Sequence, residues 1–237
     1  KHLIEELKHE NVESFQVPGF ENAVQLEEKK NVFLTSAFKD GLFEVQDAGS
    51  QKIGEFLDVK PGMRVVDACA GAGGKTLHLA ALMENKGQII AMDIHGWKLA
   101  ELKRRAKRAG AHNIETREIT DNKVIKRLHE KADRLLIDAP CSGLGVLKRN
   151  PDSKWKIDQD FIDRIRKEQE TILQDYSKII KKGGKMVYAT CSILPSENNE
   201  QVENFLKNNP DFKLVKEEKV MPSTGFDGFY MALIERV

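Results

Sequence analysis

The chain has 237 residues, 40% of them hydrophobic, and a formal net charge of +1, which fits one large α/β domain, or one domain with a short appendage. With so little net charge, any nucleic acid must be bound through a local basic face. Three widely spaced cysteines argue against a disulfide framework and against zinc, so we expect no metal and a cytoplasmic protein with reduced thiols. No apolar run reaches the roughly 20 residues of a membrane helix, so we expect no membrane contact.

The first 60 residues give the weakest pattern. Residues 1–8 indicate a helix, residues 32–38 a strand, and residues 47–57 a helix just before the first core strand. We therefore divide the chain into residues 1–45, an N-terminal cap segment or the remnant of a further domain, and residues 46–237, the main domain.

From about residue 63 onward, short runs rich in Val, Ile and Leu alternate with stretches of helical period. This alternation predicts a mostly parallel sheet covered by helices on both faces. The tail predicts an antiparallel pair of strands at one edge, and Gly183-Gly184 predicts the end of the last long helix. The predicted strands are 64–68, 88–92, 113–118, 133–137, 185–189, 212–217 and 228–235, and the predicted helices are 75–83, 97–109, 121–129 and 158–180.

A glycine-rich loop, residues 67–75, follows the first core strand and opens a helix, where a ligand can approach the backbone closely. A phosphate-binding loop of the Gly-x4-Gly-Lys-Thr type would need glycine where Cys69 stands. A dinucleotide loop of the Gly-x-Gly-x-x-Gly type would need glycine where Thr76 stands. Both motifs fail by one defining residue.

Acidic residues follow three successive strands, and they fit S-adenosylmethionine as the third candidate. Asp67 suits a ligand that carries an ammonium group and no pyrophosphate, and Asp93 is placed to bind ribose hydroxyls. Asp121 follows the third strand, where the adenine should lie. The alternative is that these acids only cap helices.

Two cysteines follow the fourth and fifth strands, within Asp138-Ala-Pro-Cys141-Ser-Gly and Thr-Cys191-Ser. If these strands are neighbours about 4.8 Å apart, the two sulfurs share one cleft. A thiolate that adds to carbon 6 of cytosine makes carbon 5 nucleophilic enough to accept a methyl group, with Asp138 and Lys75 as supporting polar groups. The residues alone leave open which cysteine attacks, and free cysteines can also be small core residues.

Several of these segments resemble the RsmB/Sun-like (Nop/Sun) family of RNA cytosine-5 methyltransferases, from about residue 38 to the end of the chain. The loop 67–75 is similar to the family's Asp-Ala-Cys-Ala-Ala-Pro-Gly-Gly-Lys, with Gly-Ala in place of Ala-Pro, and both cysteine motifs match unchanged. Four further segments also match: 46–50, 149–152, 195–198 and 227–230.

The resemblance implies a Rossmann-like S-adenosylmethionine-dependent methyltransferase fold, with a mostly parallel seven-stranded sheet and an antiparallel C-terminal edge strand. Residues 46–237 would be the catalytic domain, and residues 1–45 a cap or the remnant of an RNA-binding domain. The implied reaction is methylation of cytosine carbon 5 in RNA, mainly ribosomal RNA and sometimes transfer RNA. We expect a monomer.

The resemblance also implies roles for individual residues. Cys191 would be the nucleophile, Cys141 would assist product release, Asp138 would contact the cytosine ring, and Lys75 would lie beside the base and the methionine end. The Cys69 side chain itself is expected to be structural. The residues expected to bind the cofactor are Cys69, Ala70, Gly71, Ala72, Gly73, Gly74, Lys75, Asp93, Asp121 and Asp138.

Cations around a tryptophan, in the loop after the fourth strand, are the predicted RNA contacts: Lys148, Arg149, Lys154 and Trp155. The basic run at 104–108 is expected to be a solvated helix face. Two alternative functions stay open. An amine-directed methyltransferase would carry an aromatic residue after the fourth strand, where this chain has cysteine, and a catalytically silent RNA-binding scaffold would not need both cysteines.

Overall fold

The computed structural model describes residues 1–237, apart from the side chain at position 224. Its main feature is a seven-stranded sheet in the order β5-β4-β3-β6-β7-β9-β8, in which β9 runs antiparallel to both of its neighbours. The predicted fold is confirmed, with β8 as the edge strand and β9 one place inside it. The strands are β3 (Arg64–Asp67), β4 (Gln88–Asp93), β5 (Ile114–Glu118), β6 (Ala132–Asp138), β7 (Ile180–Thr190), β8 (Phe212–Val220) and β9 (Phe229–Arg236).

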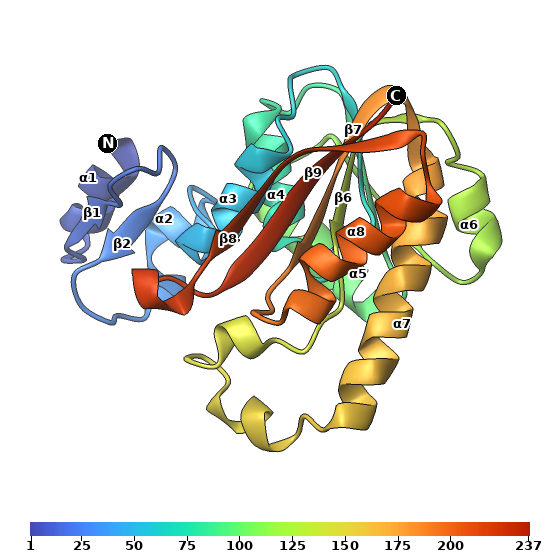
Figure 1. The fold of residues 1–237 in the computed structure, drawn as a ribbon. Coiled ribbons are helices and arrows are strands. Elements are labelled where there is room, and N and C mark those ends of the chain that lie inside the picture. The colour runs from blue at the N-terminus through green and yellow to red at the C-terminus, as the bar shows by residue number, and fades with distance from the viewer.

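Helices cover both faces of this sheet (Figure 1). One core cluster joins one face to α3 (Ala48–Phe56) and α4 (Gly74–Leu82), and another joins the opposite face to α6 (Asn122–Lys126), α7 (Gln159–Tyr176) and α8 (Asn199–Asn208). Neighbouring strand residues such as Val65 and Val66 belong to different clusters and are both fully buried. Burial on both faces explains why the strands are continuously apolar. Further helices are α5 (Gly96–Arg108), η2 (Leu144–Val146), η3 (Pro151–Trp155), η4 (Ser177–Ile179), η5 (Pro195–Glu197) and η6 (Pro222–Thr224).

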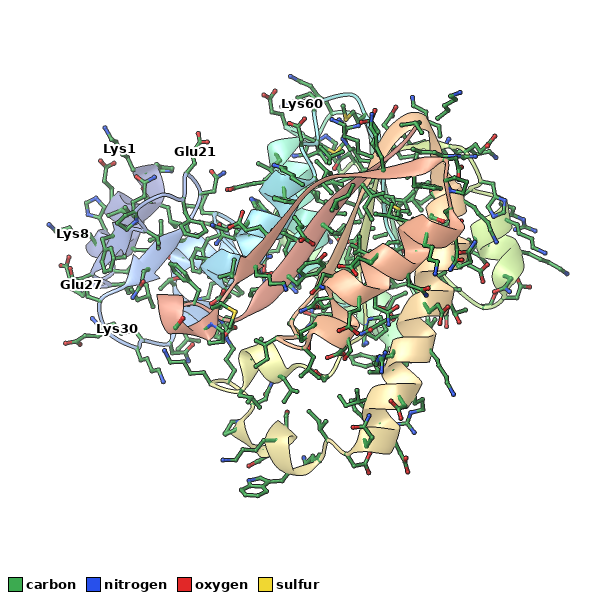
Figure 2. All side chains as sticks on the ribbon, in the orientation of Figure 1. Lys1, Lys8, Glu21, Glu27, Lys30 and Lys60 are labelled. Atoms are coloured by element: carbon green, nitrogen blue, oxygen red, sulfur yellow. The ribbon has the colours of Figure 1, made fainter. Side chains whose placement is uncertain are left out.

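The N-terminal segment has a small core of its own, built from Leu7, Val12, Val32 and Ala37. It contains α1 (His2–His9), the hairpin of β1 (Ser14–Gln16) and β2 (Val24–Leu26), η1 (Val32–Leu34) and α2 (Ser36–Lys39). Charged side chains, among them the labelled Lys1, Lys8 and Glu27, project outward from it (Figure 2). The division at residue 45 stays a prediction. Among the described residues, no helix combines the length and the apolar character needed to cross a membrane.

The predicted strand at residues 32–38 is wrong, because two local caps favour helical turns there. The side chain of Asn31 accepts a hydrogen bond from the Phe33 backbone at the start of η1, and Thr35 Oγ1 accepts one from the Phe38 backbone at the start of α2. Such caps favour helical turns over an extended chain.

The predicted helix end at Gly183-Gly184 is also wrong. α7 ends at Tyr176, η4 continues to Ile179, and both glycines lie within β7. There the ladder between β6 and β7 shifts register. Gly183 has φ +77°, and a Cβ on Gly184 would lie 2.9 Å from the Lys181 carbonyl oxygen. The glycines therefore allow an irregular turn of the strand rather than ending a helix.

Candidate active site

A cavity of about 340 Å³ opens at the carboxyl ends of the central strands β3, β4 and β6. Parallel sheets commonly bind ligands at this edge. The cavity includes predicted site residues from the glycine loop and from the ends of β4 and β6. It is lined by Ala68, Cys69, Gly71, Asp93, Ile94, His95, Lys98, Ile119, Asp138, Pro140, Glu168, Ile172 and Tyr176.

The glycine loop wraps closely over the end of β3 because Gly73 has no side chain. Gly73 is the N-cap of α4 with φ +90°, and a Cβ there would lie 2.4 Å from the Leu102 side chain. Gly71 donates its backbone N–H to Asp93 Oδ2 at 2.9 Å, which ties the loop to the end of β4. The loop therefore faces the cavity with backbone rather than with bulky side chains.

Asp93 is held rigidly at the edge of this cavity. Its second oxygen, Oδ1, accepts the backbone N–H of His95 at 2.8 Å. Each carboxylate oxygen has a further lone pair, which is available to a ligand hydroxyl. The apolar side chains Ile94 and Ile119 line the same cavity, although sequence reasoning did not identify them.

Two predicted acids lie elsewhere. Asp121 caps α6 by accepting the Lys123 backbone N–H at 2.7 Å, and it is absent from the described lining of the cavity, so its cofactor role stays a prediction. Asp67 is buried, accepts the Thr76 hydroxyl at 2.7 Å, and is likewise outside that described lining. Burial raises the pKa of Asp67 to about 7.

The two cysteines of the strand-end motifs meet beside this cavity. β6 and β7 are parallel neighbours, with Asp138 opposite Ala189. The following loops bring Cys141 Sγ to 3.2 Å from Cys191 Sγ, and the Cys191 backbone N–H donates to Cys141 Sγ at 3.3 Å. Both thiols are free and partly buried. The geometry therefore brings the two sulfurs together as predicted, while neither cysteine is among the described residues that line the cavity.

Lys75 and Asp138 form an ion pair of 2.6 Å next to the thiols. Burial lowers the pKa of Lys75, but the Asp138 carboxylate more than offsets that effect, so the lysine pKa is raised. A hydrogen bond with Cys141 lowers the pKa of Cys191 against the opposing effects of burial and of the Asp138 carboxylate, and the Lys75 ammonium also lowers it. The same hydrogen bond and burial hold the pKa of Cys141 well above its usual range.

The two pKa shifts have opposite directions, so they distinguish Cys191 from Cys141, whereas the sequence left open which cysteine attacks. If Cys141 keeps its proton, it donates S–H to Cys191 Sγ while its own sulfur accepts the Cys191 backbone N–H. Cys191 is then the sulfur that ionises more readily.

The predicted RNA contacts differ in their surroundings. Trp155 is 80% exposed on η3, and the Lys154 ammonium lies 4.9 Å from the centre of its ring. Lys148 is exposed as well. Arg149 instead pairs with Asp47 at 2.9 Å and Asp227 at 2.6 Å, so it joins three distant segments of the chain.

The basic run on α5 is a solvated helix face only in part, because Arg104 and Lys107 are exposed whereas Arg105 and Arg108 are partly buried. Arg105 donates to Glu44 at 2.9 Å and to the Ala72 carbonyl at 2.8 Å. Arg108 pairs with the same glutamate, and its guanidinium lies 3.8 Å from the centre of the Phe38 ring. These two arginines attach the N-terminal segment to the glycine loop.

A family model described as 16S rRNA methyltransferase RsmB/F matches residues 55–234 of this chain. The chain belongs to this family. The matched range contains the glycine loop, both cysteine motifs and every described residue of the cavity lining. The family that the motifs resemble is thus confirmed.

Curated relatives carry consistent names. The chain is 36% identical over 212 residues to the probable ribosomal RNA small subunit methyltransferase B of Bacillus subtilis, covering 89% of this chain and 47% of the relative. It is 35% identical over 233 residues to ribosomal RNA small subunit methyltransferase B of Proteus mirabilis, covering 97% and 54% respectively. The chain therefore spans about half the length of these relatives.

Solved structures of similar chains have the same architecture. The crystal structure of PH0851 superposes with a TM-score of 0.94 at 33% identity, covering 99% of this chain and 56% of the other. NSun6 from Pyrococcus horikoshii, solved with SFG, gives 0.80 at 28% identity, covering 91% and 59%. The fold is that of S-adenosylmethionine-dependent methyltransferases.

Proposed function

We propose that the protein is an S-adenosylmethionine-dependent methyltransferase of ribosomal RNA that modifies cytosine at carbon 5, with Cys191 as the covalent nucleophile. The observation that carries this proposal is the pair of thiols, 3.2 Å apart, beside the Lys75–Asp138 ion pair and next to the cavity. Methylation of an amine needs no such pair. The names of the relatives support ribosomal RNA as the substrate class.

The residues of the cavity fit the cofactor. Asp93, fixed by two backbone N–H groups, suits ribose hydroxyls, and Ile94 and Ile119 offer apolar surfaces to an adenine ring. SFG, with which the similar NSun6 was solved, is an analogue of this cofactor. When bound, S-adenosylmethionine supplies the methyl group that carbon 5 accepts.

The chain's own residues perform the remaining chemistry. The Cys191 thiolate forms a bond from Sγ to carbon 6 of cytosine, which transfers electron density to carbon 5. Asp138 faces the ring, and Lys75 maintains positive charge beside the thiolate. A water molecule then takes the proton from carbon 5, the electrons of that bond restore the double bond between carbons 5 and 6, and the bond between Cys191 Sγ and carbon 6 breaks and regenerates the thiolate. Cys141, in contact with Cys191, assists this release.

RNA is held by the loop after β6. A base must leave its stack to reach a buried thiol, and exposed aromatic side chains beside cations are typical stacking platforms for such strands. Trp155 with Lys154, and the exposed Lys148, provide these features.

Covalent trapping with RNA that contains 5-azacytidine tests this proposal, because the analogue blocks release of the attacking cysteine. The wild-type protein should form an adduct stable in denaturing gels, and Cys191→Ala should form none. Cys141→Ala should accumulate an adduct even with ordinary RNA. Ser223→Ala, at an exposed position of η6, is the control and should behave like wild type. Adduct formation by Cys191→Ala, or a methyl group found on an exocyclic nitrogen, contradicts the proposal.

A further inference from the structure

The segment Pro195–Asn198 matches a family motif but has no part in the chemistry described so far. Its third residue, Glu197, is fully buried. The carboxylate accepts hydrogen bonds from the Ser142 backbone N–H at 2.8 Å, from Ser142 Oγ at 2.5 Å and from Gln169 Nε2 at 3.1 Å. Ser192 Oγ donates to it as well. Four donors therefore satisfy this buried charge.

These donors are arranged symmetrically about the reactive thiols. Ser142 directly follows Cys141, and Ser192 directly follows Cys191. The two serine hydroxyls lie 3.1 Å apart and both donate to Glu197 Oε2. One carboxylate thus joins the residues next to both cysteines.

The neighbouring Asn198 strengthens the contact on the Cys191 side. Its Nδ2 donates to the Ser192 carbonyl at 2.9 Å, and its Oδ1 accepts the Thr190 hydroxyl at 2.5 Å. The residues on both sides of Cys191 are therefore fixed by the same motif.

The cysteine loops need such a contact because they lie beyond the sheet. The last bond between the two strand ends is Ala139 N–H to the Ala189 carbonyl, and both cysteines come after it. Farther along, the Gly145 N–H donates to the Cys191 carbonyl at 2.8 Å. Between these two backbone bonds, Glu197 joins the loops through side chains.

From this geometry we infer that Glu197 is a positioning residue that holds Cys141 against Cys191, so that the nucleophile is a ready thiolate and the releasing group is in reach. This inference rests on the proposed function. Misplacement of reacting groups by about 1 Å can reduce a rate about 100-fold. The inference also gives the two serines a role. Each is hydrogen-bonded to the Glu197 carboxylate and directly follows one of the cysteines, so it fixes the backbone next to that cysteine.

Three variants test this inference: Glu197→Gln, which has the same shape, the double variant Ser142→Ala/Ser192→Ala, and Ser196→Ala as a matched control from the same segment. The first readout is the alkylation of Cys191 by iodoacetamide as a function of pH, followed by mass spectrometry of its peptide. It needs neither RNA nor methyl transfer, so it stays informative if the proposed reaction is wrong. The second readout is kcat and KM for RNA methylation.

Loss of the hydrogen bond from Cys141 should move the alkylation profile of both test variants to higher pH and lower the rate at pH 7 at least about threefold. kcat should fall about 10- to 100-fold, while KM for S-adenosylmethionine stays within about twofold. The Ser196→Ala variant should match wild type in both readouts.

The inference is overturned if both test variants keep the wild-type alkylation profile. It is also overturned if kcat and cofactor affinity fall together with no shift in that profile, because this pattern indicates a purely structural role. Should Glu197→Gln fail to fold, the serine double variant decides the question, since it keeps the carboxylate bonded to Gln169 and to the Ser142 backbone. Wild-type protein that fails to methylate cytosine contradicts the proposed function alone.

Discussion

Asp67 ends β3 beneath the glycine loop and leads to a prediction about stability. Burial raises the pKa of this carboxyl from 3.8 to about 7, against the opposing hydrogen bond from Thr76. The folded protein therefore holds the proton more tightly than the unfolded chain does. Stability should fall as the pH rises from about 4, and the loss should be complete above about pH 7.

The substitution Asp67→Asn removes this titration and keeps an oxygen that can accept the Thr76 hydroxyl, now at 2.7 Å. At about 1.4 kcal/mol for each unit between 3.8 and about 7, the wild-type penalty is about 4 kcal/mol at pH 8 and about 1.5 kcal/mol at pH 5. The buried amide introduces unpaired donors that cost about 1–3 kcal/mol at either pH. That cost is the same at both pH values and cancels when they are compared. Relative to wild type, the unfolding free energy of Asp67→Asn should therefore be about 2.5 kcal/mol higher at pH 8 than at pH 5.

Urea unfolding followed by circular dichroism at pH 5, 6, 7 and 8 measures this gain. The control is Asp152→Asn on the exposed helix η3, which separates the effect of burial from the loss of one negative charge. A stability difference between Asp67→Asn and wild type that stays constant with pH, or that grows toward acid, refutes the reasoning.

Three further predictions concern the N-terminal segment, RNA and acid stability. Glu44→Ala leaves Arg105 and Arg108 without their shared carboxylate, so the unfolding free energy should drop by about 3 kcal/mol. Limited proteolysis should then cleave within residues 1–45 first, and an unchanged cleavage pattern contradicts this. Trp155→Ala should weaken RNA binding by about 1–3 kcal/mol in fluorescence anisotropy without changing affinity for S-adenosylmethionine, and equal affinity for RNA would exclude stacking. Burial lowers the pKa of His78 to about 4, so His78 stays neutral in the folded protein at pH values where it is protonated in the unfolded chain. Between pH 7 and pH 4 the unfolding free energy of wild type should therefore fall by about 3 kcal/mol relative to that of His78→Phe. Urea unfolding that shows the same pH dependence for both proteins would contradict this.

Much of the sheet could be predicted because its central strands are apolar on both faces. The turn at Gly183-Gly184 was misassigned because a glycine pair is equally compatible with a helix end and with an irregular strand. What decides between them is the pairing of β7 with β6, almost 50 residues earlier in the chain. The segment 32–38 was misassigned for a local reason, since two side-chain caps outweigh its β-favouring residues.

Sequence reasoning placed correctly the residues that follow the ends of their own strands, namely Asp93, Asp138 and the two cysteines. Residues whose roles depend on contacts between distant segments were not found. Glu197 reaches the serine at position 142, and no local pattern reports such a contact. Arg149 was predicted as an RNA contact from its place among the loop cations around Trp155, and the sequence did not indicate its two carboxylate partners, which lie about 80 and 100 residues away.

The position of the thiols follows from packing in the core of the sheet. Tyr188 and Val187 are both fully buried and belong to clusters on opposite faces of β7. A slip of one residue along β6 would move the end of β7 by about 3.3 Å and place every side chain on the wrong face. Such a slip is strongly disfavoured, so Ala189 stays opposite Asp138 and the chain leaves both strands at the same level. The irregular turn at Gly183 lies at the far end of β7, where differences in strand length can be accommodated without changing that register. Cysteines 50 residues apart can therefore act as one unit because hydrophobic burial fixes the two strands that carry them.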